Sequence, residues 1–195
     1  MRRTASRSTL AAKVLLLALL AACDDSSPPV EMPTAATSAP ASASPSPSPV
    51  PSAAPVTAEE AKQQALEAYL GMQTAFAAAG KISDPEYPDL RKYTTGAALD
   101  LFTTALAKRK QEGIFARGGT INHAKVTEIS PAKAPTKALI QDCMDTRKTG
   151  LYKPNGDPVP QDKGGFRLAL ADLKLVGGTW KVTDLAVRKV GSCKL

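Results

Sequence analysis

The sequence has few of the residues on which enzyme chemistry most often depends. His123 is the only histidine among 195 residues, and no pair of the three cysteines has zinc-binding spacing. No metal site is therefore expected, and a mechanism that needs a histidine base has one candidate. A phosphate-binding glycine loop is also missing, because the lysine that such loops require does not follow Gly118-Gly119. The sequence assigns no catalytic residue.

Aromatic residues are scarce, and they are unevenly distributed. All of them lie between Tyr69 and Trp180, whereas the first 56 residues have none. Large apolar side chains are what a packed core is built from. The foldable part is therefore predicted to be one domain, residues 57–195.

The first 22 residues have the layout of a secretory signal peptide. A basic start with Arg2 and Arg3 precedes an apolar run from Val14 to Leu20, and small residues follow. The run is too short to span a bilayer, which takes roughly 20 apolar residues. Residues 1–22 are predicted to be a signal peptide for export by general secretion.

Leu20-Ala21-Ala22-Cys23 closes this segment and resembles the lipobox of bacterial lipoproteins. In that family the cysteine sulfur receives a diacylglyceryl group, and a peptidase cuts just before the cysteine. The resemblance implies a covalent diacylglyceryl lipid on Cys23, no other cofactor, and attachment to the outer face of the cytoplasmic membrane. Two acyl chains on one residue are enough for stable anchoring. The alternative is an ordinary secretory cleavage beside an incidental cysteine.

Residues 23–56 form a tract of proline, serine and alanine after the lipid-accepting cysteine. Nine of the 16 prolines lie here, with Ser44-Pro45-Ser46-Pro47 at the centre. Such a composition cannot bury enough apolar surface to fold. We expect a disordered stalk that lifts the domain off the membrane.

The formal net charge of +7 overstates how basic the mature chain is. Four of the 25 basic residues lie in the predicted signal peptide, which leaves 21 basic residues against 18 acidic ones, or +3. The longest basic run, Lys108-Arg109-Lys110, is interpreted as a solvated helix face. Since no aromatic residues alternate with the basic ones, a nucleic-acid partner is not expected.

The first half of the domain has helical signals. Thr57 and Glu60 have the spacing of a capping box, which predicts a helix over 58–79 that ends at Gly80. A short helical turn over 89–93 and a second long helix over 95–111 should follow. The apolar positions predict buried faces that carry Ala65, Tyr69, Met72, Phe76 and Ala79 on the first long helix and Leu99, Phe102 and Leu106 on the second.

After Gly119 the pattern changes to extended segments, at about 120–129, 135–145, 165–176 and 179–189. Gly177-Gly178 predicts a two-residue hairpin turn between the last two segments. The turn sets Leu175 opposite Trp180, Leu173 opposite Val182, Leu170 opposite Leu185 and Leu168 opposite Val187. The last two pairs change face, which predicts a bulge or bend near 171–184, or else a sheet covered on both faces.

Helices followed by a curved antiparallel four-stranded meander make an α+β fold. Here the chain resembles the NTF2-like superfamily and the uncharacterised bacterial lipoproteins that carry this cone-shaped fold. The residues that carry the resemblance are Pro88-Asp89-Leu90, Tyr93 to Gly96, Gly113, Arg117-Gly118-Gly119, Asp142 to Asp145, Gly178 to Val182 and Cys193. The resemblance implies a fold and not an activity, since the superfamily includes enzymes and binding modules.

Without Cys23, the domain retains Cys143 and Cys193, an even pair in an oxidising compartment. In the meander the strands that end near these residues run in the same direction, two strand spacings or about 9.6 Å apart. Cys193 lies past its strand and can fold back, so a disulfide between the two is predicted.

The sequence favours a non-catalytic domain that binds either a small apolar ligand or an envelope protein. Phe102, Phe166 and Trp180 are candidates to line a pocket in the cone, together with His123 or Asp142. The segment 146–164 would be either the rim of that pocket or a surface insertion. An isomerase or dehydratase that uses His123 is the alternative.

Overall fold

The structure, a computed structural model, describes residues 56–161 and 163–195. These residues belong to a compact unit, Val50–Leu195. The predicted signal peptide, the lipobox and residues 23–55 of the predicted stalk lie outside the described residues. Among the helices of the described part, none combines the length and the apolar character needed to cross a bilayer.

The first helix, α1 (Ala58–Ile82), begins at the predicted capping box. The Thr57 N–H donates to Glu60 Oε2 at 2.8 Å, and the Glu60 N–H donates to Thr57 Oγ1 at 3.2 Å. The predicted end at Gly80 is wrong, because the helix continues to Ile82 and is capped by Ser83 at φ 49°. Gly80 instead permits close packing, since a Cβ there would lie 3.0 Å from the Cβ of Ala116.

Two more helices follow, α2 (Pro88–Tyr93) and α3 (Gly96–Glu112). Gly113 ends α3 at φ 64°, as predicted. Both long helices bury the faces that their apolar spacing indicates, with Phe76 and Leu99 only partly buried. The helical half of the prediction is therefore confirmed, apart from the end of α1.

In the part of the chain that the structure describes, six strands follow the helices. Four of them, β2 (Ala124–Ser130), β3 (Lys137–Asp145), β5 (Phe166–Val176) and β6 (Thr179–Val187), form an antiparallel sheet in the order β2-β3-β5-β6. This is the predicted four-stranded meander. Two short strands that were not predicted, β1 (Phe115–Gly118) and β4 (Thr149–Tyr152), pair as a separate small sheet. The segment 146–164 therefore contains ordered structure.

The hairpin between β5 and β6 has the predicted turn, with Gly177 and Gly178 at φ 56° and 78°. Leu173 pairs with Val182 as expected, but the next pair is Asp172 with Asp184, so Thr183 is an extra residue in β6. The predicted bulge is therefore present, but on one strand only. The predicted pairs Leu170–Leu185 and Leu168–Val187 are wrong: Leu185 faces Ala171, and Val187 faces Ala169.

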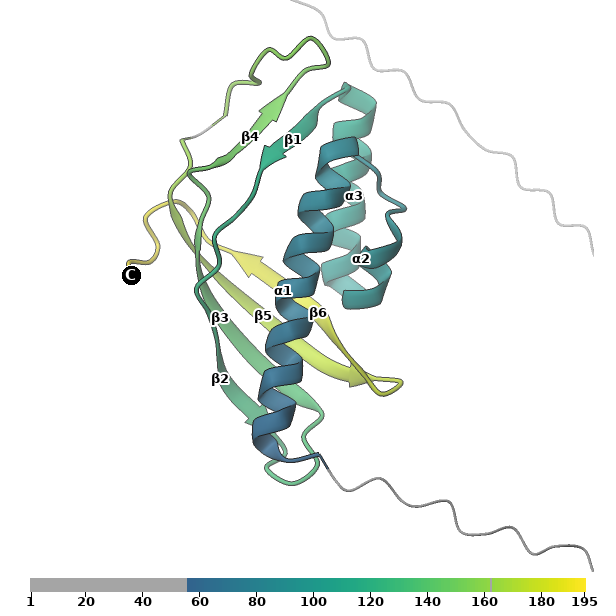
Figure 1. The fold of residues 1–195 in the computed structure, drawn as a ribbon, viewed down its shortest axis with the longest axis vertical. Coiled ribbons are helices and arrows are strands. Elements are labelled where there is room, and N and C mark those ends of the chain that lie inside the picture. The colour runs from purple at the N-terminus through teal and green to yellow at the C-terminus, as the bar shows by residue number, and fades with distance from the viewer. Residues whose placement is uncertain (1–55, 162) are drawn as a thin grey trace, which may run out of the picture. The chain divides into compact units, whose positions relative to one another are not determined.

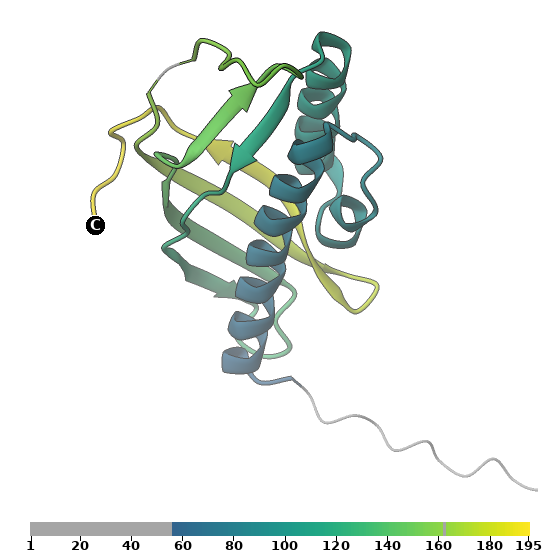
Figure 2. The same cartoon turned by 45° about the horizontal axis from the view of Figure 1, so that its top comes forward.

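The bulge changes which β6 side chains face the core and leaves β5 regular. Ala169, Ala171 and Leu173 are all buried on the face that packs on the helices, whereas Leu170 is 38% exposed on the opposite face. Figures 1 and 2 show α1 lying across this helical face of the four-stranded sheet, with β1 and β4 at one end. One core cluster joins the helices to the sheet.

The predicted disulfide between Cys143 and Cys193 is present, with a Cα–Cα distance of 5.8 Å. After β6 the chain folds back over the start of β5. The Gly191 N–H donates to the Phe166 carbonyl, and the Ser192 hydroxyl oxygen accepts from the Leu168 N–H. The tail thus bridges the two strand spacings that separate β6 from β3.

Removing this cross-link should destabilise the domain. The bond closes a loop with a sequence separation of 50, so we expect the Cys143→Ser, Cys193→Ser double variant to lose roughly 4 kcal/mol of unfolding free energy. Urea denaturation measures the loss, and the wild type under reducing agent is the matched comparison. A double variant as stable as the oxidised wild type would contradict the expectation.

Candidate functional site

A cavity of about 270 Å³ lies at the end of the helical face where β1 and β4 stand. Side chains from α1, α3, both short strands and the large sheet surround it. Its lining includes Gln73, Phe76, Ala77, Phe102, Arg109, Ala116, Arg117, Gly118, Met144, Thr149, Leu151, Gln161, Arg167, Leu185 and Val187.

The inner wall of the cavity is apolar. Phe76 of α1 and Phe102 of α3 pack with ring centroids 4.4 Å apart and planes tilted by 31°. Met144 comes from β3, and Leu185 and Val187 come from β6 beyond the bulge. The extra residue in β6 is what turns Leu185 and Val187 to this side of the sheet.

The outer wall is the small sheet of β1 and β4. Gly118 ends β1 at φ 81°, and a Cβ there would lie 1.7 Å from the Lys148 carbonyl oxygen. Only glycine allows the two strands to meet in this way. The Ser83 hydroxyl donates to the Ile114 carbonyl and fixes the start of this wall to the end of α1.

Three arginines line the cavity: Arg109 from α3, Arg117 from β1 and Arg167 from β5. Arg109 is half-buried, while its neighbours Lys108 and Lys110 are exposed. The interpretation of this basic run as a solvated face is therefore wrong for its middle residue. Burial lowers the pKa of the Arg109 guanidinium below its usual range.

A hydrogen-bond network lies behind the cavity, centred on the fully buried Asp142. Its Oδ2 accepts from the Tyr69 hydroxyl at 2.9 Å and from the Asn122 amide at 2.6 Å, and its Oδ1 accepts from the His123 backbone N–H at 2.7 Å. The Gln73 amide in turn donates to the Tyr69 oxygen at 2.8 Å. The carboxylate therefore ties the segment before β2 to α1.

The Asp142 network is better suited to holding structure than to proton transfer. Burial, followed by the charge of Asp142, raises the pKa of the Tyr69 hydroxyl far above its usual range, so the hydroxyl stays protonated and donates. Neither Tyr69 nor Asp142 lines the cavity, and both are fully buried. Only Gln73 connects the network to the cavity wall. A general base must come within reach of its substrate.

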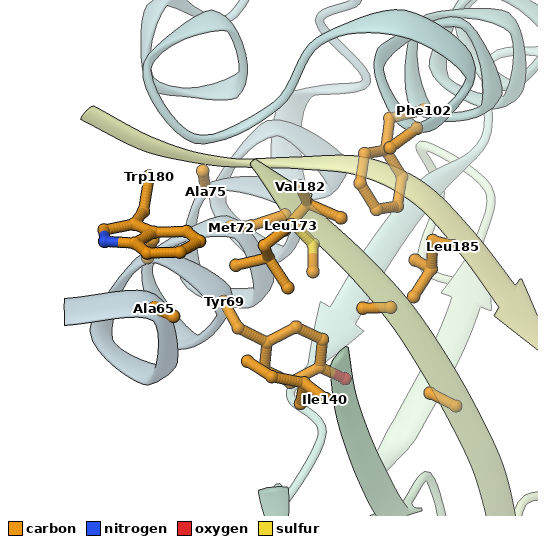
Figure 3. Packing of buried hydrophobic residues seen from close by; sticks show 14 of the residues in the cluster. Ala65, Tyr69, Met72, Ala75, Phe102, Ile140, Leu173, Trp180, Val182 and Leu185 are labelled. Carbon is orange, nitrogen blue, oxygen red and sulfur yellow. The ribbon is translucent and has the colours of Figure 1, made fainter. Parts of the chain in front are cut away.

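The five candidate pocket residues do not come together. Phe102 lines the cavity, and Asp142 lies behind it. Trp180 is buried at the opposite end of the core cluster from Phe102 (Figure 3). The His123 side chain is exposed, and the Phe166 ring centroid lies 4.8 Å from the Arg147 Cζ. Neither His123 nor Phe166 belongs to the cavity wall.

A second carboxylate, Asp145, is buried near the cavity but has its own partner. Hydrogen bonds from Arg147, at 2.9 Å from Nε and 2.6 Å from Nη2, hold the pKa of Asp145 at about 2. Among residues 56–161 and 163–195, no group of three acidic, histidine or cysteine side chains could hold a metal ion.

A larger depression of about 660 Å³ lies elsewhere, across all four strands of the large sheet and beside the start of α3. Charged side chains of both signs line it, among them Glu128, Lys137, Asp172 and Lys174. Such a surface has neither the apolar wall nor the single sign of charge that marks the smaller cavity, so the smaller one is the better candidate.

The buried carboxylate network should matter for stability. Tyr69→Phe removes one donor to Asp142 and the acceptor for Gln73, so we expect a loss of about 1–2 kcal/mol of unfolding free energy. Asp142→Ala should cost more, because it leaves several buried donors without an acceptor. Tyr87→Phe, at a partly buried tyrosine, is the control and should stay within about 0.5 kcal/mol of the wild type. Urea denaturation tests this order, and an equal effect of Tyr69→Phe and Tyr87→Phe would refute it.

No protein-family model matches the chain, and neither does any curated protein. Solved structures to which it is similar include the intermembrane-space region of the chloroplast protein ARC6, at 16% identity over 65% of this chain and 95% of that one, with a TM-score of 0.47. A protein with a cystatin-like fold from Nostoc punctiforme matches at 9% identity over 70% and 96%, with a TM-score of 0.41. An NTF2-like family protein from Streptomyces avermitilis, provisionally assigned as a dehydratase, matches at 15% identity over 69% and 99%, with a TM-score of 0.40. These likenesses are too distant to indicate an activity.

Proposed function

We propose that this protein is an exported lipoprotein whose NTF2-like domain binds a small ligand in the cavity between α1, α3 and the small sheet. The observation that carries the binding role is the cavity itself. It combines an apolar inner wall with a few polar and cationic groups, which is the usual composition of a small-molecule site. Most of the space between α1 and the sheet is filled by the buried side chains of the core cluster, and this cavity lies where that packing ends.

A binding role suits this cavity better than catalysis by His123. The exposed His123 side chain is absent from the cavity wall, and the buried Asp142 and Tyr69 are separated from the cavity by Gln73. No described residue of the wall has both the proton-transfer chemistry and the position of a general base. The open face of the sheet has partly exposed leucines, Leu139 and Leu170, but nothing on it indicates what would cover them.

The proposed anchor depends on the sequence, since Cys23 lies outside the described residues. The apolar run followed by Leu20-Ala21-Ala22-Cys23 supports lipidation on the cysteine sulfur. A diacylglyceryl group would hold the chain at the membrane surface. The proline-rich tract that precedes α1 would then separate the cavity from the lipid.

Cys23→Ala should release the anchor. In a bacterial host that processes lipoproteins, we expect the wild type in the membrane fraction and the variant either in the soluble fraction or uncut. Cys193→Ser removes a cysteine outside the lipobox and should stay in the membrane fraction. Fractionation and intact mass measure the outcome, and a processed Cys23→Ala protein that stays membrane-bound would refute the anchor.

Filling the cavity should abolish ligand binding. We choose naphthalene-2-carboxylate and its neutral amide as probes, because the ring system is small and apolar. At least one should bind the full chain carrying Cys23→Ala, with a Kd measured by ligand fluorescence. Ala77→Phe places a ring in the cavity and should weaken that binding about tenfold or more, whereas Gln64→Phe adds the same ring at an exposed position of α1 and should not. If neither probe binds, or if Ala77→Phe has no effect, the binding role is wrong.

A further inference from the structure

The described residues that line the cavity carry charge of one sign. Arg109, Arg117 and Arg167 are cationic, and no aspartate or glutamate stands among the described lining residues. The three arginines come from three different elements, α3, β1 and β5. The fold therefore brings together cations that lie far apart in the sequence.

Aromatic rings hold two of these guanidiniums in place. The Arg109 Cζ lies 5.4 Å from the ring centroid of Phe76, and the Arg117 Cζ lies 4.6 Å from that of Tyr152. Stacking on a ring fixes the plane of a guanidinium while its N–H groups at the edge can still donate. The two arginines are thus positioned without the use of their donors.

Carboxylate partners distinguish these arginines from Arg91 and Arg147. Arg91 pairs with Glu86 at 3.1 Å, and Arg147 pairs with Asp145 at 2.6 Å. Within residues 56–161 and 163–195, no carboxylate lies within 4.0 Å of a side-chain nitrogen of Arg109, Arg117 or Arg167. A partly buried cation without a counter-ion has a free-energy cost that a bound anion would offset.

Given the binding role proposed above, we infer that the ligand is a small organic anion. Its apolar body would pack on Phe76, Phe102 and Leu185, and its carboxylate or phosphate group would pair with Arg109. Arg109 is the first choice because it is half-buried, and an ion pair is stronger where water is excluded. The exposed Arg117, on the outer wall, would attract the anion to the cavity.

The cavity volume limits the size of such a ligand. About 270 Å³ admits an aromatic acid of one or two rings, or a short acyl chain with an acidic head. It cannot enclose a whole diacyl lipid. The fit is therefore to a small amphipathic acid or phosphate monoester, rather than to a membrane lipid.

The experiment compares three probes that share one ring system: naphthalene-2-carboxylate, 2-naphthyl phosphate and naphthalene-2-carboxamide. The full chain with Cys23→Ala is titrated with each by ligand fluorescence. We expect the Kd of at least one anion to be about tenfold or more below that of the amide. Arg109→Gln should weaken the binding of that anion by about tenfold or more and change the Kd of the amide by less than about twofold.

Lys110→Gln is the matched control, because it removes one positive charge from the next residue of α3 at an exposed position. It should leave all three Kd values within about twofold of the wild type. If Arg109→Gln lowers the melting temperature strongly, Arg117→Gln on the exposed wall replaces it. This variant should likewise weaken the binding of the anion by about tenfold or more and change the Kd of the amide by less than about twofold.

The outcomes separate this inference from the binding role itself. Equal Kd values for the anions and the amide, all raised by Ala77→Phe, would overturn the anionic ligand and leave the binding role intact. An equal loss of anion binding in Arg109→Gln and Lys110→Gln would also overturn it, because the effect would then be one of overall charge. No binding of any probe would overturn both.

Discussion

The close approach of α1 to the four-stranded sheet is the constraint on which the rest of the domain depends. The buried face of α1 carries five alanines, Ala61, Ala65, Ala68, Ala75 and Ala79, and β5 presents Ala169 and Ala171 beneath the helices. Small side chains on both sides bring the backbones together. Tyr69 and Met72 then fill the space that remains, with Trp180 at the far end. Towards its end, α1 packs against β1, and the cavity lies there.

The negative charge of Asp142 lies in the buried network, and the positive charges of the three arginines lie in the cavity wall. The buried carboxylate of Asp142 is used up by donors from Tyr69, Asn122 and the backbone of His123, so it offers nothing to a ligand. The cations face the cavity instead. This separation lets one small domain keep a fully satisfied negative charge in its core and an unsatisfied positive surface beside it. Gln73 stands at the boundary between the two.

Local patterns predicted the elements, and long-range contacts decided what the patterns left open. The capping box, the helix faces and the glycine hairpin depend on neighbouring residues, so they were predictable. The register beyond Thr183 was not, because an extra residue in one strand is favoured by what packs on it, here Thr95, whose N–H donates to the Val182 carbonyl. β1 and β4 have only four residues each, too few for a period to show. Arg109 did have a signal: it follows Leu106 by three positions on the buried side of α3.

The core of the domain joins its first helix, α1, to its last strand, β6, and the disulfide attaches the segment after β6 to β3. Trp180 and Val182 of β6 belong to the same core as Ala65 and Met72 of α1, and Cys143 of β3 is joined to Cys193 beyond β6. A chain that emerges amino-terminus first therefore cannot complete the core of this domain until β6 has been synthesised. Up to that moment the alanine-rich face of α1 has no sheet to cover it. The domain therefore folds late in its own synthesis, and contacts between segments that are distant in the sequence limit its folding rate.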